Sequence, residues 1–252
     1  MRFTYLIYLL FISLFFNCKQ PKEYLTKIEG KQIQIADSLT TNAEIEAFIA
    51  PYRLHIEKDL DSVLAYAPNT YSKSDGDFNT ALGNFMADAI FDEANPIFKS
   101  RTGNSIDMVI LNHGGIRSII SKGNITTRTA FELMPFENSL IVVALKGSQV
   151  DSLTHYLSKA RRAHPISKLK LSIDKNFNVI EATINGEKID ANKTYYVATN
   201  DYLYNGGDDM TFFKPNEGMF VLDYKIRNAL IDNFKKVDTI NPVIDDRFIQ
   251  IK

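Results

Sequence analysis

The segment Met108-Val109-Ile110-Leu111-Asn112-His113-Gly114-Gly115-Ile116-Arg117 passes from an apolar run into a polar loop that contains two glycines. A short apolar run that ends at such a loop is typical of a buried strand. Glycines at the end of a strand let the backbone come close to a ligand. The guanidinium of Arg117 is a planar cation that suits phosphate. This segment therefore predicts a buried strand that ends in a ligand-binding loop.

Two later segments supply further parts of such a site. Pro135 stiffens the chain immediately before the aromatic ring of Phe136. Farther along, the strand-like run Tyr195–Thr199 leads into a second glycine loop, residues 200–209, with the sequence Asn-Asp-Tyr-Leu-Tyr-Asn-Gly-Gly-Asp-Asp. Together the loops carry a cation, a carboxylate and aromatic rings. This combination suits an aromatic, anionic ligand such as a nucleotide.

Each candidate side chain also has an ordinary structural explanation. Arg117 could form a surface ion pair, and Phe136 or Tyr202 could belong to the core instead of stacking on a base. Asp208 could be a turn carboxylate rather than a partner of ribose hydroxyls, and Asn112 could cap its loop rather than bind a base edge. Stacking on an aromatic ring is worth roughly 1–3 kcal/mol per base.

Several catalytic classes lack their signatures in this sequence. No Asp-x-His, Gly-Asn-His or Gly-His-x-His motif surrounds the four histidines, so we expect no two-metal hydrolase centre, no metal ligands and no catalytic residues in this chain. The Walker loop, Gly-x-Ser-x-Gly and Gly-x-Gly-x-x-Gly are also absent. One cysteine cannot build an intrachain disulfide or a cysteine-based zinc site. A net charge of −1 predicts no nucleic-acid partner.

The N-terminus has the composition of a targeting segment. Arg2 precedes the apolar run 5–16, which ends at Asn17-Cys18. A charged start and a short apolar stretch are typical of a secretory signal, and the run is short for a membrane span. Cys18 stands where a bacterial lipoprotein is cleaved and lipidated.

We therefore expect residues 1–17 to be a lipoprotein signal peptide, residues 18–42 a tether and residues 43–252 a single domain. The protein would then be extracytoplasmic and anchored to a bacterial membrane through a lipid on Cys18. The residues before Cys18 are larger than usual at such a site. A cleaved soluble secretion signal and an uncleaved anchor therefore stay open as alternatives.

Apolar periodicity predicts an α+β domain, with a mixed β-sheet flanked by helices. A turn is expected at Gly123-Asn124. The expected helices are 43–65 with an interruption at Pro51, one from Asn79 or Thr80 to about Asn95-Pro96, 126–133, 150–161 and 225–234. The expected strands are 32–35, 108–111, 140–145, 169–173, 179–184, 195–199 and 248–251.

Four motifs in this order resemble the C-terminal, substrate-binding domain of 5'-nucleotidases. They are Asn-His-Gly-Gly-Ile-Arg at 112–117, Gly-Asn-Ile-Thr at 123–126, Met-Pro-Phe-Glu-Asn at 134–138 and Asn-Asp-Tyr-Leu-Tyr-Asn-Gly-Gly-Asp at 200–208. The helix with Leu82-Gly83-Asn84 and Asp88-Ala89 also matches. The resemblance covers roughly residues 70–252.

The resemblance implies a role for each matching residue. Phe136 and Tyr202 would enclose the nucleobase, with Tyr202 in place of the phenylalanine common in the family. Asp208 would hold the ribose hydroxyls. Asn112 would touch the base or sugar, and Arg117 would reach the phosphate or ribose. The two glycines between them, Gly114 and Gly115, would permit close approach.

Two departures from the family pattern shape the functional hypotheses. Family members usually carry one or two phosphate-binding arginines before the Leu-Gly-Asn helix, but residues 71–80 contain none, and Lys73 is their only basic residue. Arg117 is then the only clear cation in the expected cleft. The family also places a two-metal catalytic domain first, and the stretch between Cys18 and the matching region has none of its ligands.

We therefore expect the nucleotide-binding half of a 5'-nucleotidase-type phosphohydrolase in nucleotide catabolism. A separate metallophosphatase chain would supply the divalent metals, and this chain would hold no cofactor. One alternative is a stand-alone lipoprotein that binds nucleotides or nucleosides without any hydrolase. A second is a structural surface lipoprotein whose site has decayed.

Overall fold

A computed structural model describes residues 24–36 and 38–251. The expected signal peptide and Cys18 lie outside the described residues. By its internal packing the chain divides into a first unit that ends at Phe48 and a second that begins at Ile49. Residues 24–36 form no regular structure, so the strand expected at 32–35 is wrong. Ile33 and Ile35 are both exposed, and a strand needs a neighbour to pair with.

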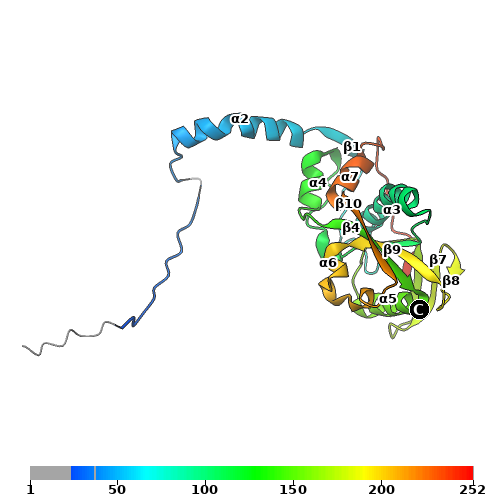
Figure 1. Cartoon of the computed structure of the whole chain (residues 1–252). Helices are drawn as coiled ribbons and strands as arrows, with labels where there is room; N and C mark the ends of the chain where they lie inside the picture. Colours follow the sequence, from blue (N-terminus) through cyan, green and yellow to red (C-terminus); the bar gives the residue numbers. More distant parts are fainter. Residues whose placement is uncertain (1–23, 37, 252) are drawn as a thin grey trace, which may run out of the picture. The chain divides into compact units, whose positions relative to one another are not determined.

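The larger unit is built on a five-stranded mixed sheet (Figure 1). Its strand order is β10 (Gly218–Lys225), β4 (Ser139–Lys146), β9 (Thr194–Asn200), β2 (Met108–Ile110) and β5 (Ile166–Ser167). β2 and β9 are parallel, and the other neighbouring pairs are antiparallel. The prediction of an α+β fold with a mixed sheet flanked by helices is confirmed.

The apolar strand β4 supplies side chains to both faces of this sheet. Leu140 and Val142 belong to one core cluster, to which α3 (Ala81–Thr102), α4 (Thr127–Leu133) and α7 (Ile226–Phe234) contribute. The alternate residues Ile141, Val143 and Leu145 belong to a second cluster. Because successive side chains of a strand point to opposite faces, a continuous apolar run indicates a sheet buried on both sides.

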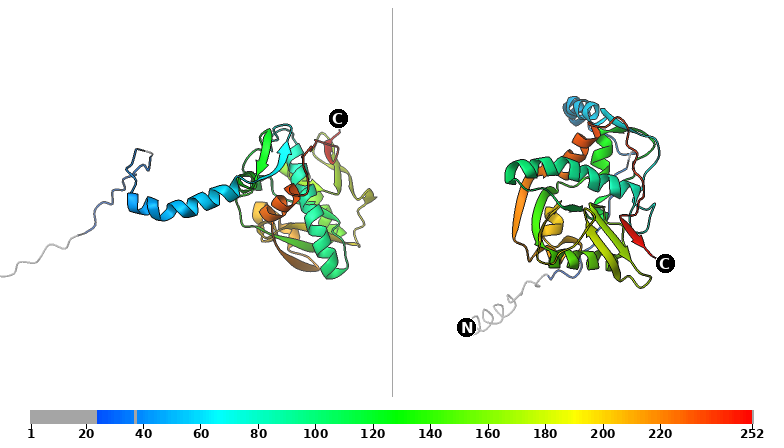
Figure 2. Two further views of the ribbon diagram at one scale, coloured as in Figure 1. Left: turned by 90° about the horizontal axis from the view of Figure 1, so that it is seen from above. Right: turned by 90° about the vertical axis from the view of Figure 1, so that its right-hand side faces the viewer.

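The second cluster lies between the five-stranded sheet, the helix α5 (Gly147–Ala160) and a smaller sheet. Figure 2 shows α3 on one side of the large sheet and α5 on the other. The smaller sheet has the order β11 (Phe248–Gln250), β6 (Leu169–Ile173), β7 (Val179–Ile184) and β8 (Glu187–Lys188). The large sheet is therefore covered on both faces, which leaves its edges and loops for other roles.

The first part of the domain differs from the expectation. α2 (Ala43–Leu60) continues through Pro51, and residues 63–67 form a strand, β1, instead of the end of a helix. β1 pairs with β3 (Gly123–Thr126), so the turn expected at Gly123-Asn124 is part of a strand. Both strands are short, and their alternation of apolar and polar residues is weak. Pairing between the two strands, which are distant in the sequence, outweighs their local conformational preferences.

α3 is also longer than expected. It passes Pro96 and ends at Thr102, where Gly103 adopts a left-handed conformation with φ 77°. A proline inside a helix removes one backbone hydrogen bond. Phe98 lies beyond Pro96 and is fully buried, and its packing offsets that loss. Within residues 24–36 and 38–251, no helix combines the length and apolar character that a membrane crossing requires.

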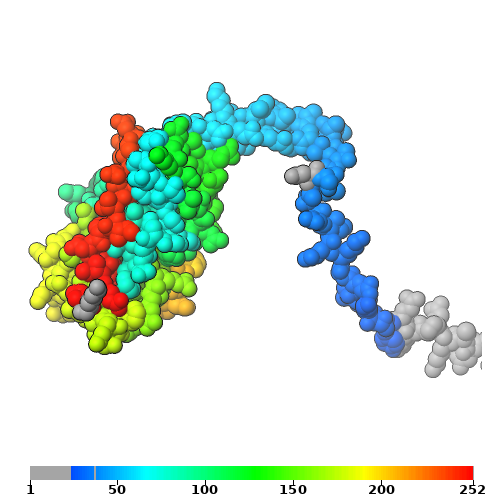
Figure 3. Space-filling model, turned by 180° about the vertical axis from the view of Figure 1, so that it is seen from behind, coloured from blue at the N-terminus to red at the C-terminus, as the bar shows by residue number. Residues whose placement is uncertain are grey.

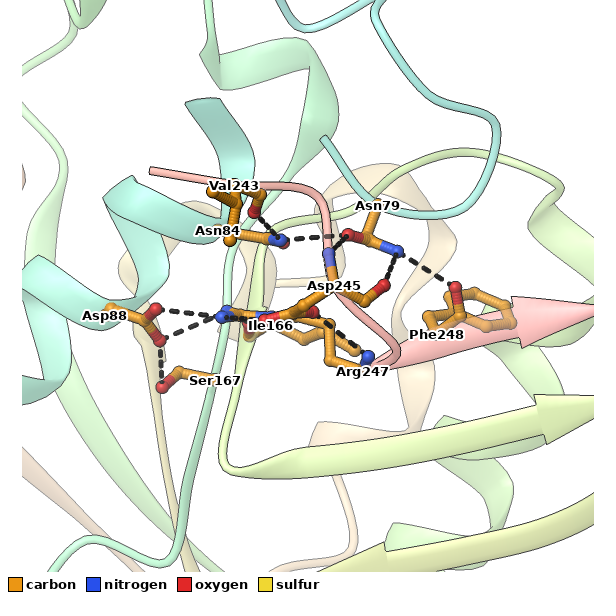
Figure 4. A network of polar contacts seen from close by, with 9 residues as sticks. All are labelled: Asn79, Asn84, Asp88, Ile166, Ser167, Val243, Asp245, Arg247 and Phe248. Atoms are coloured by element: carbon orange, nitrogen blue, oxygen red, sulfur yellow. Dashed lines mark hydrogen bonds and ion pairs between the residues drawn. The ribbon is translucent and has the colours of Figure 1, made fainter. Parts of the chain in front are cut away.

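The C-terminal segment is fastened to α3 by a polar network around Arg247. Its guanidinium contacts the carboxylate of Asp88 on α3 at 2.9 and 3.1 Å, and it contacts Asp245 at 2.8–3.0 Å. Asn84 donates to Asn79, which in turn donates to the carbonyls of Asp245 and Phe248 (Figure 4). Figure 3 shows this segment, in red, beside the cyan stretch that precedes α3. We call Asp88, Asp245 and Arg247 the Arg247 clamp.

Candidate functional site

Three loops meet at one edge of the five-stranded sheet. The parallel strands β2 and β9 end there, so the loops that follow them, with Asn112 and Tyr202, lie at the same edge. β4 runs antiparallel to β9 and begins at this edge, with Leu140 opposite Asn200. The residues just before β4, including Phe136, therefore join the other two loops. The helix α6 (Asp201–Tyr204) marks this edge in Figure 1.

These loops enclose a pocket of about 430 Å³. Its lining residues are Asn112, Gly114, Arg117, Phe136, Asn138, Tyr202 and Asp208. Six of the seven residues singled out in the sequence line this one pocket. Gly115 does not line it. Asn138 ends the motif at 134–138 and was not predicted to be a site residue.

Gly115 makes room for the side chain of Asn112. A Cβ at Gly115 would lie 2.9 Å from Asn112 Oδ1, whereas a Cβ at Gly114 would meet only Asn112 Nδ2, at 3.9 Å. Asn112 Oδ1 accepts a hydrogen bond from Asn200 Nδ2 at 3.3 Å. Asn200 also caps α6, because its Oδ1 accepts from the backbone N–H of Leu203 at 2.8 Å. The two glycine loops are thus joined through a pair of asparagines.

Arg227, at the start of α7, holds the loop that carries Phe136. Its buried guanidinium donates to the carbonyls of Met134 and Phe136 at 3.3 and 3.4 Å and forms an ion pair with Glu137. The hydrogen bond from Arg227 lowers the pKa of Glu137. At the end of the loop, Asn138 Nδ2 donates to Asp201 Oδ1 at 3.0 Å. All three loops are therefore linked to one another.

Tyr202 and Asp208 form the far wall of the pocket. Tyr202 Oη donates to Asp208 Oδ1 at 2.9 Å, and this hydrogen bond raises the pKa of Tyr202. A Cβ at Gly207 would lie 2.4 Å from the Tyr202 ring, so only glycine fits beneath the ring. Asp208 adopts a left-handed conformation, with φ 51° and ψ 27°. Non-glycine residues adopt it less often than glycine, although aspartate does so more readily than most.

The aromatic rings and the cation of the pocket face open space. Phe136 and Tyr202 are 42% and 45% exposed, so neither belongs to the core. Among the described residues Arg117 forms no ion pair, and its Nη1 lies 3.4 Å from the carbonyl of Gly114. Its Cζ is 5.7 Å from the centroid of the Phe136 ring, within cation–π range. Lys73 donates to the carbonyl of Ile116 at 2.8 Å and does not line the pocket.

Two histidines, His113 and His164, form hydrogen-bonding contacts next to the end of β2. The Nδ1 atom of His164 is 3.3 Å from both the carbonyl of Leu111 and the N–H of His113. Burial lowers the pKa of His164 to about 4, so its ring is neutral at neutral pH. The ring of His113 contacts the carbonyl of Ala163 at 3.1 Å. No group of three or more His, Cys, Asp or Glu side chains within the described part of the chain is arranged to hold a metal.

Sequence reasoning did not identify the residues that support the pocket. Asn138 and Asn200 stood inside the quoted motifs, so their position beside the candidate residues was the available signal. No local sequence motif indicated that Arg227 or Tyr156 would support the pocket. Tyr156 lies on α5, and its Oη donates to the carbonyl of Asp208 at 2.7 Å. Such contacts join positions 52 and 91 residues apart in the sequence, and only the fold brings them together.

Comparison with known proteins identifies the family of this chain. The family described as 5'-nucleotidase, C-terminal domain, matches residues 60–215. The trifunctional nucleotide phosphoesterase protein YfkN of Bacillus subtilis is 31% identical over 190 residues, which cover 68% of this chain and 12% of that protein. The cell wall protein Lmo0130 of Listeria monocytogenes is 28% identical over 228 residues, which cover 81% of this chain and 28% of that protein.

A solved structure has the same fold. The 5'-nucleotidase precursor of Thermus thermophilus superposes with a TM-score of 0.69 at 24% identity, over 82% of this chain and 43% of that one. The chain therefore spans less than half of each of these three proteins. The family match covers more than half of the chain and includes all the residues that line the pocket. The chain belongs to the 5'-nucleotidase C-terminal domain family.

Proposed function

We propose that this chain, as a member of the 5'-nucleotidase C-terminal domain family, binds a nucleotide in the pocket between its two glycine loops. The base would lie between Phe136 and Tyr202, the ribose at Asp208 and the phosphate toward Arg117. The observation that carries this proposal is the pocket itself. In about 430 Å³ it gathers exposed aromatic rings, a carboxylate and a guanidinium that forms no ion pair with any described residue.

Each part of a nucleotide has a chemical counterpart in this pocket. Stacking on an aromatic ring supplies roughly 1–3 kcal/mol per base and tolerates different bases. The Asp208 carboxylate offers about four lone-pair sites, of which Tyr202 occupies one, so ribose hydroxyls can donate to the others. Arg117 can donate two parallel hydrogen bonds to a phosphate. The amide of Asn112 can both donate to and accept from a base or sugar.

We propose that hydrolysis is carried out by a separate metallophosphatase chain, as the family resemblance suggests. That partner would hold the divalent metals and activate water. This chain would contribute substrate binding and present the phosphate at the mouth of the pocket. Its residues Asn112, Gly114, Gly115, Arg117, Phe136, Tyr202 and Asp208 would act in binding rather than in catalysis.

We further propose that the protein works outside the cytoplasm, anchored through a lipid on Cys18. The sequence before Cys18 and the named cell wall relative support this location. Metabolic labelling with palmitate should mark the wild-type protein and not a Cys18→Ala variant. Recovery of both proteins in the soluble extracytoplasmic fraction would contradict the anchor.

Calorimetry and a phosphate-release assay test the functional proposal. Purified protein should bind AMP and adenosine, and absence of binding at millimolar concentrations would overturn the proposal. The chain alone should release no phosphate from AMP with added divalent metal, whereas a co-expressed metallophosphatase should release it faster with this chain than without it. Phosphate release by this chain alone would contradict the proposal that a separate chain carries out hydrolysis. Binding without any effect on a partner enzyme would favour a stand-alone binding protein.

A further inference from the structure

Tyr202 does more in this pocket than present a ring. Its hydroxyl donates to Asp208 Oδ1 at 2.9 Å, although 45% of the residue is exposed to solvent. A tyrosine at this exposure could direct its hydroxyl to water. The ring packs closely against Gly207, where a Cβ would lie 2.4 Å from the ring. This packing holds the ring in the orientation in which the hydroxyl reaches Asp208.

Asp208 is held at a second point, on its backbone. Tyr156 Oη donates to the carbonyl of Asp208 at 2.7 Å. The left-handed φ values of Asp208 and Asp209, 51° and 58°, show that this turn needs support from its surroundings. Tyr156 therefore holds the backbone of the turn, and Tyr202 holds the carboxylate that projects from it.

A fixed carboxylate matters for a ligand with two neighbouring hydroxyl groups. A carboxylate that turns freely must be ordered when it binds, and the ordering of a side chain costs binding free energy. The Tyr202 bond restrains the rotation of the carboxylate and occupies one lone-pair site of Oδ1. Among the described residues no hydrogen bond reaches Oδ2. The free sites are thus oriented before the ligand arrives.

We propose that the Tyr202 hydroxyl is a positioning group that presets Asp208 for the cis-diol of a ribose, and so makes the pocket selective for ribonucleosides over sugars that lack the diol. This inference rests on the proposed nucleotide-binding function. The hydroxyl acts through Asp208, while the ring of the same residue stacks on the base. The two contributions can be separated because phenylalanine retains the ring.

The test compares two ligands in three proteins by calorimetry. Adenosine carries the 2',3'-diol, and 2',3'-dideoxyadenosine has the same base without it. Tyr202→Phe should weaken adenosine binding by about fivefold, since the carboxylate must then be ordered on binding, and should leave dideoxyadenosine binding unchanged. Tyr204→Phe is the matched control. Tyr204 lies two residues away on α6, and no described residue hydrogen-bonds its hydroxyl, so both affinities should stay at the wild-type values.

The outcomes separate this inference from the proposed function. Equal loss of both ligands in Tyr202→Phe would mean that the hydroxyl affects the pocket as a whole and would overturn the inference. Unchanged binding of both ligands would also overturn it, as would wild-type protein that binds adenosine no better than dideoxyadenosine. In each of these cases nucleotide binding itself would stand. Wild-type protein that binds neither ligand would instead refute the proposed function.

Discussion

The pocket and the Arg247 clamp each contain an arginine and a carboxylate, and they differ in how these charges are paired. In the clamp the guanidinium of Arg247 contacts two carboxylates and the carbonyl of Ile166, at 2.7–3.1 Å (Figure 4). In the pocket the guanidinium of Arg117 has one contact with a described protein acceptor, at 3.4 Å. A polar group that is satisfied within the protein stabilises the fold, whereas one left open is available to a ligand.

The clamp and the pocket also differ in backbone conformation and in the burial of their side chains. The clamp fastens the C-terminal segment between α3 and β5, and the side chain of Arg247 is only 16% exposed. The pocket keeps Phe136 and Tyr202 nearly half exposed and holds Asp208 in a left-handed conformation. Functional sites often violate local stability rules in this way, at a cost that other regions offset. We therefore expect substitutions in the clamp to lower stability and substitutions in the pocket to lower affinity.

The largest effect is expected from Arg247→Ala. The substitution leaves Asp88 and Asp245 without their common partner. Arg247 is largely buried, but the two carboxylates are 46% and 35% exposed and partly screened by water, so we expect a loss of about 2–3 kcal/mol, below that of a fully buried pair. Urea denaturation should show this loss in the free energy of unfolding. Calorimetry below the unfolding transition should show unchanged adenosine binding, because the clamp does not line the pocket.

Lys170→Ala is the matched control for the clamp. Lys170 pairs with Asp246, the neighbour of Asp245, but both side chains are at least half exposed. Such surface pairs contribute only about 0–1 kcal/mol. Equal destabilisation by Arg247→Ala and Lys170→Ala would remove the contrast between a structural clamp and an ordinary surface pair.

His164, behind the pocket, should make stability depend on pH. Burial depresses its pKa from 6.5 to about 4 in the folded chain. Between these values the unfolded chain binds more protons, so stability falls as the pH falls through this window. From pH 7 to pH 4.5 this residue should account for about 2 kcal/mol of lost stability.

The measurement compares the wild type with His164→Asn by urea denaturation at several pH values. Asparagine does not titrate in this range and retains a nitrogen near the position of Nδ1. The variant should show a shallower loss of stability on acidification. Parallel pH profiles would show that His164 is not buried as a neutral ring, and the support of the pocket would need another explanation.

Replacement of Phe136 tests the other side of the comparison. Phe136→Ala removes a stacking surface worth roughly 1–3 kcal/mol, so adenosine and AMP should each bind about tenfold more weakly. Because 42% of Phe136 is exposed, the free energy of unfolding should change little. Tyr66→Ala is the control, since Tyr66 is 40% exposed and lies on β1, outside the pocket. A large loss of stability without a loss of affinity would assign Phe136 to the fold.

Local sequence patterns predicted the central strands and the parts of the pocket. The apolar runs of β2, β4 and β9 indicated buried strands, and the glycine loops followed them. β10 was missed, although Met219–Leu222 is apolar, because Asp223 interrupts the run with a left-handed φ of 53° and the pairing with β4 shifts there. An edge strand with a bulge has a weaker pattern than a central one.

The clamp and the pocket supports could not be predicted in the same way. Asp88 and Arg247 are 159 residues apart, and no spacing rule connects them. The sequence places Asp88 only as part of a family motif on a helix. Whether an Asp, Asn or Arg is paired or open depends on the tertiary fold, so residue type alone does not separate a clamp from a binding site.

The smallest expected effect, and the most specific, comes from Arg117→Ala. Arg117 is exposed, so its interaction with phosphate is screened by solvent and should be worth about 1 kcal/mol. AMP should therefore bind about fivefold more weakly, and adenosine, which has no phosphate, should bind as before. The AMP effect should shrink in high salt.

Arg128→Ala is the control because Arg128 is a surface arginine already paired with Asp61 at 2.9 Å. It should change neither affinity. Equal weakening of AMP and adenosine by Arg117→Ala would point to the Phe136 ring, 5.7 Å from the guanidinium, as its true partner. Arg117 would then be held by a contact within the protein, and the pocket would lack the open cation that is proposed to bind phosphate.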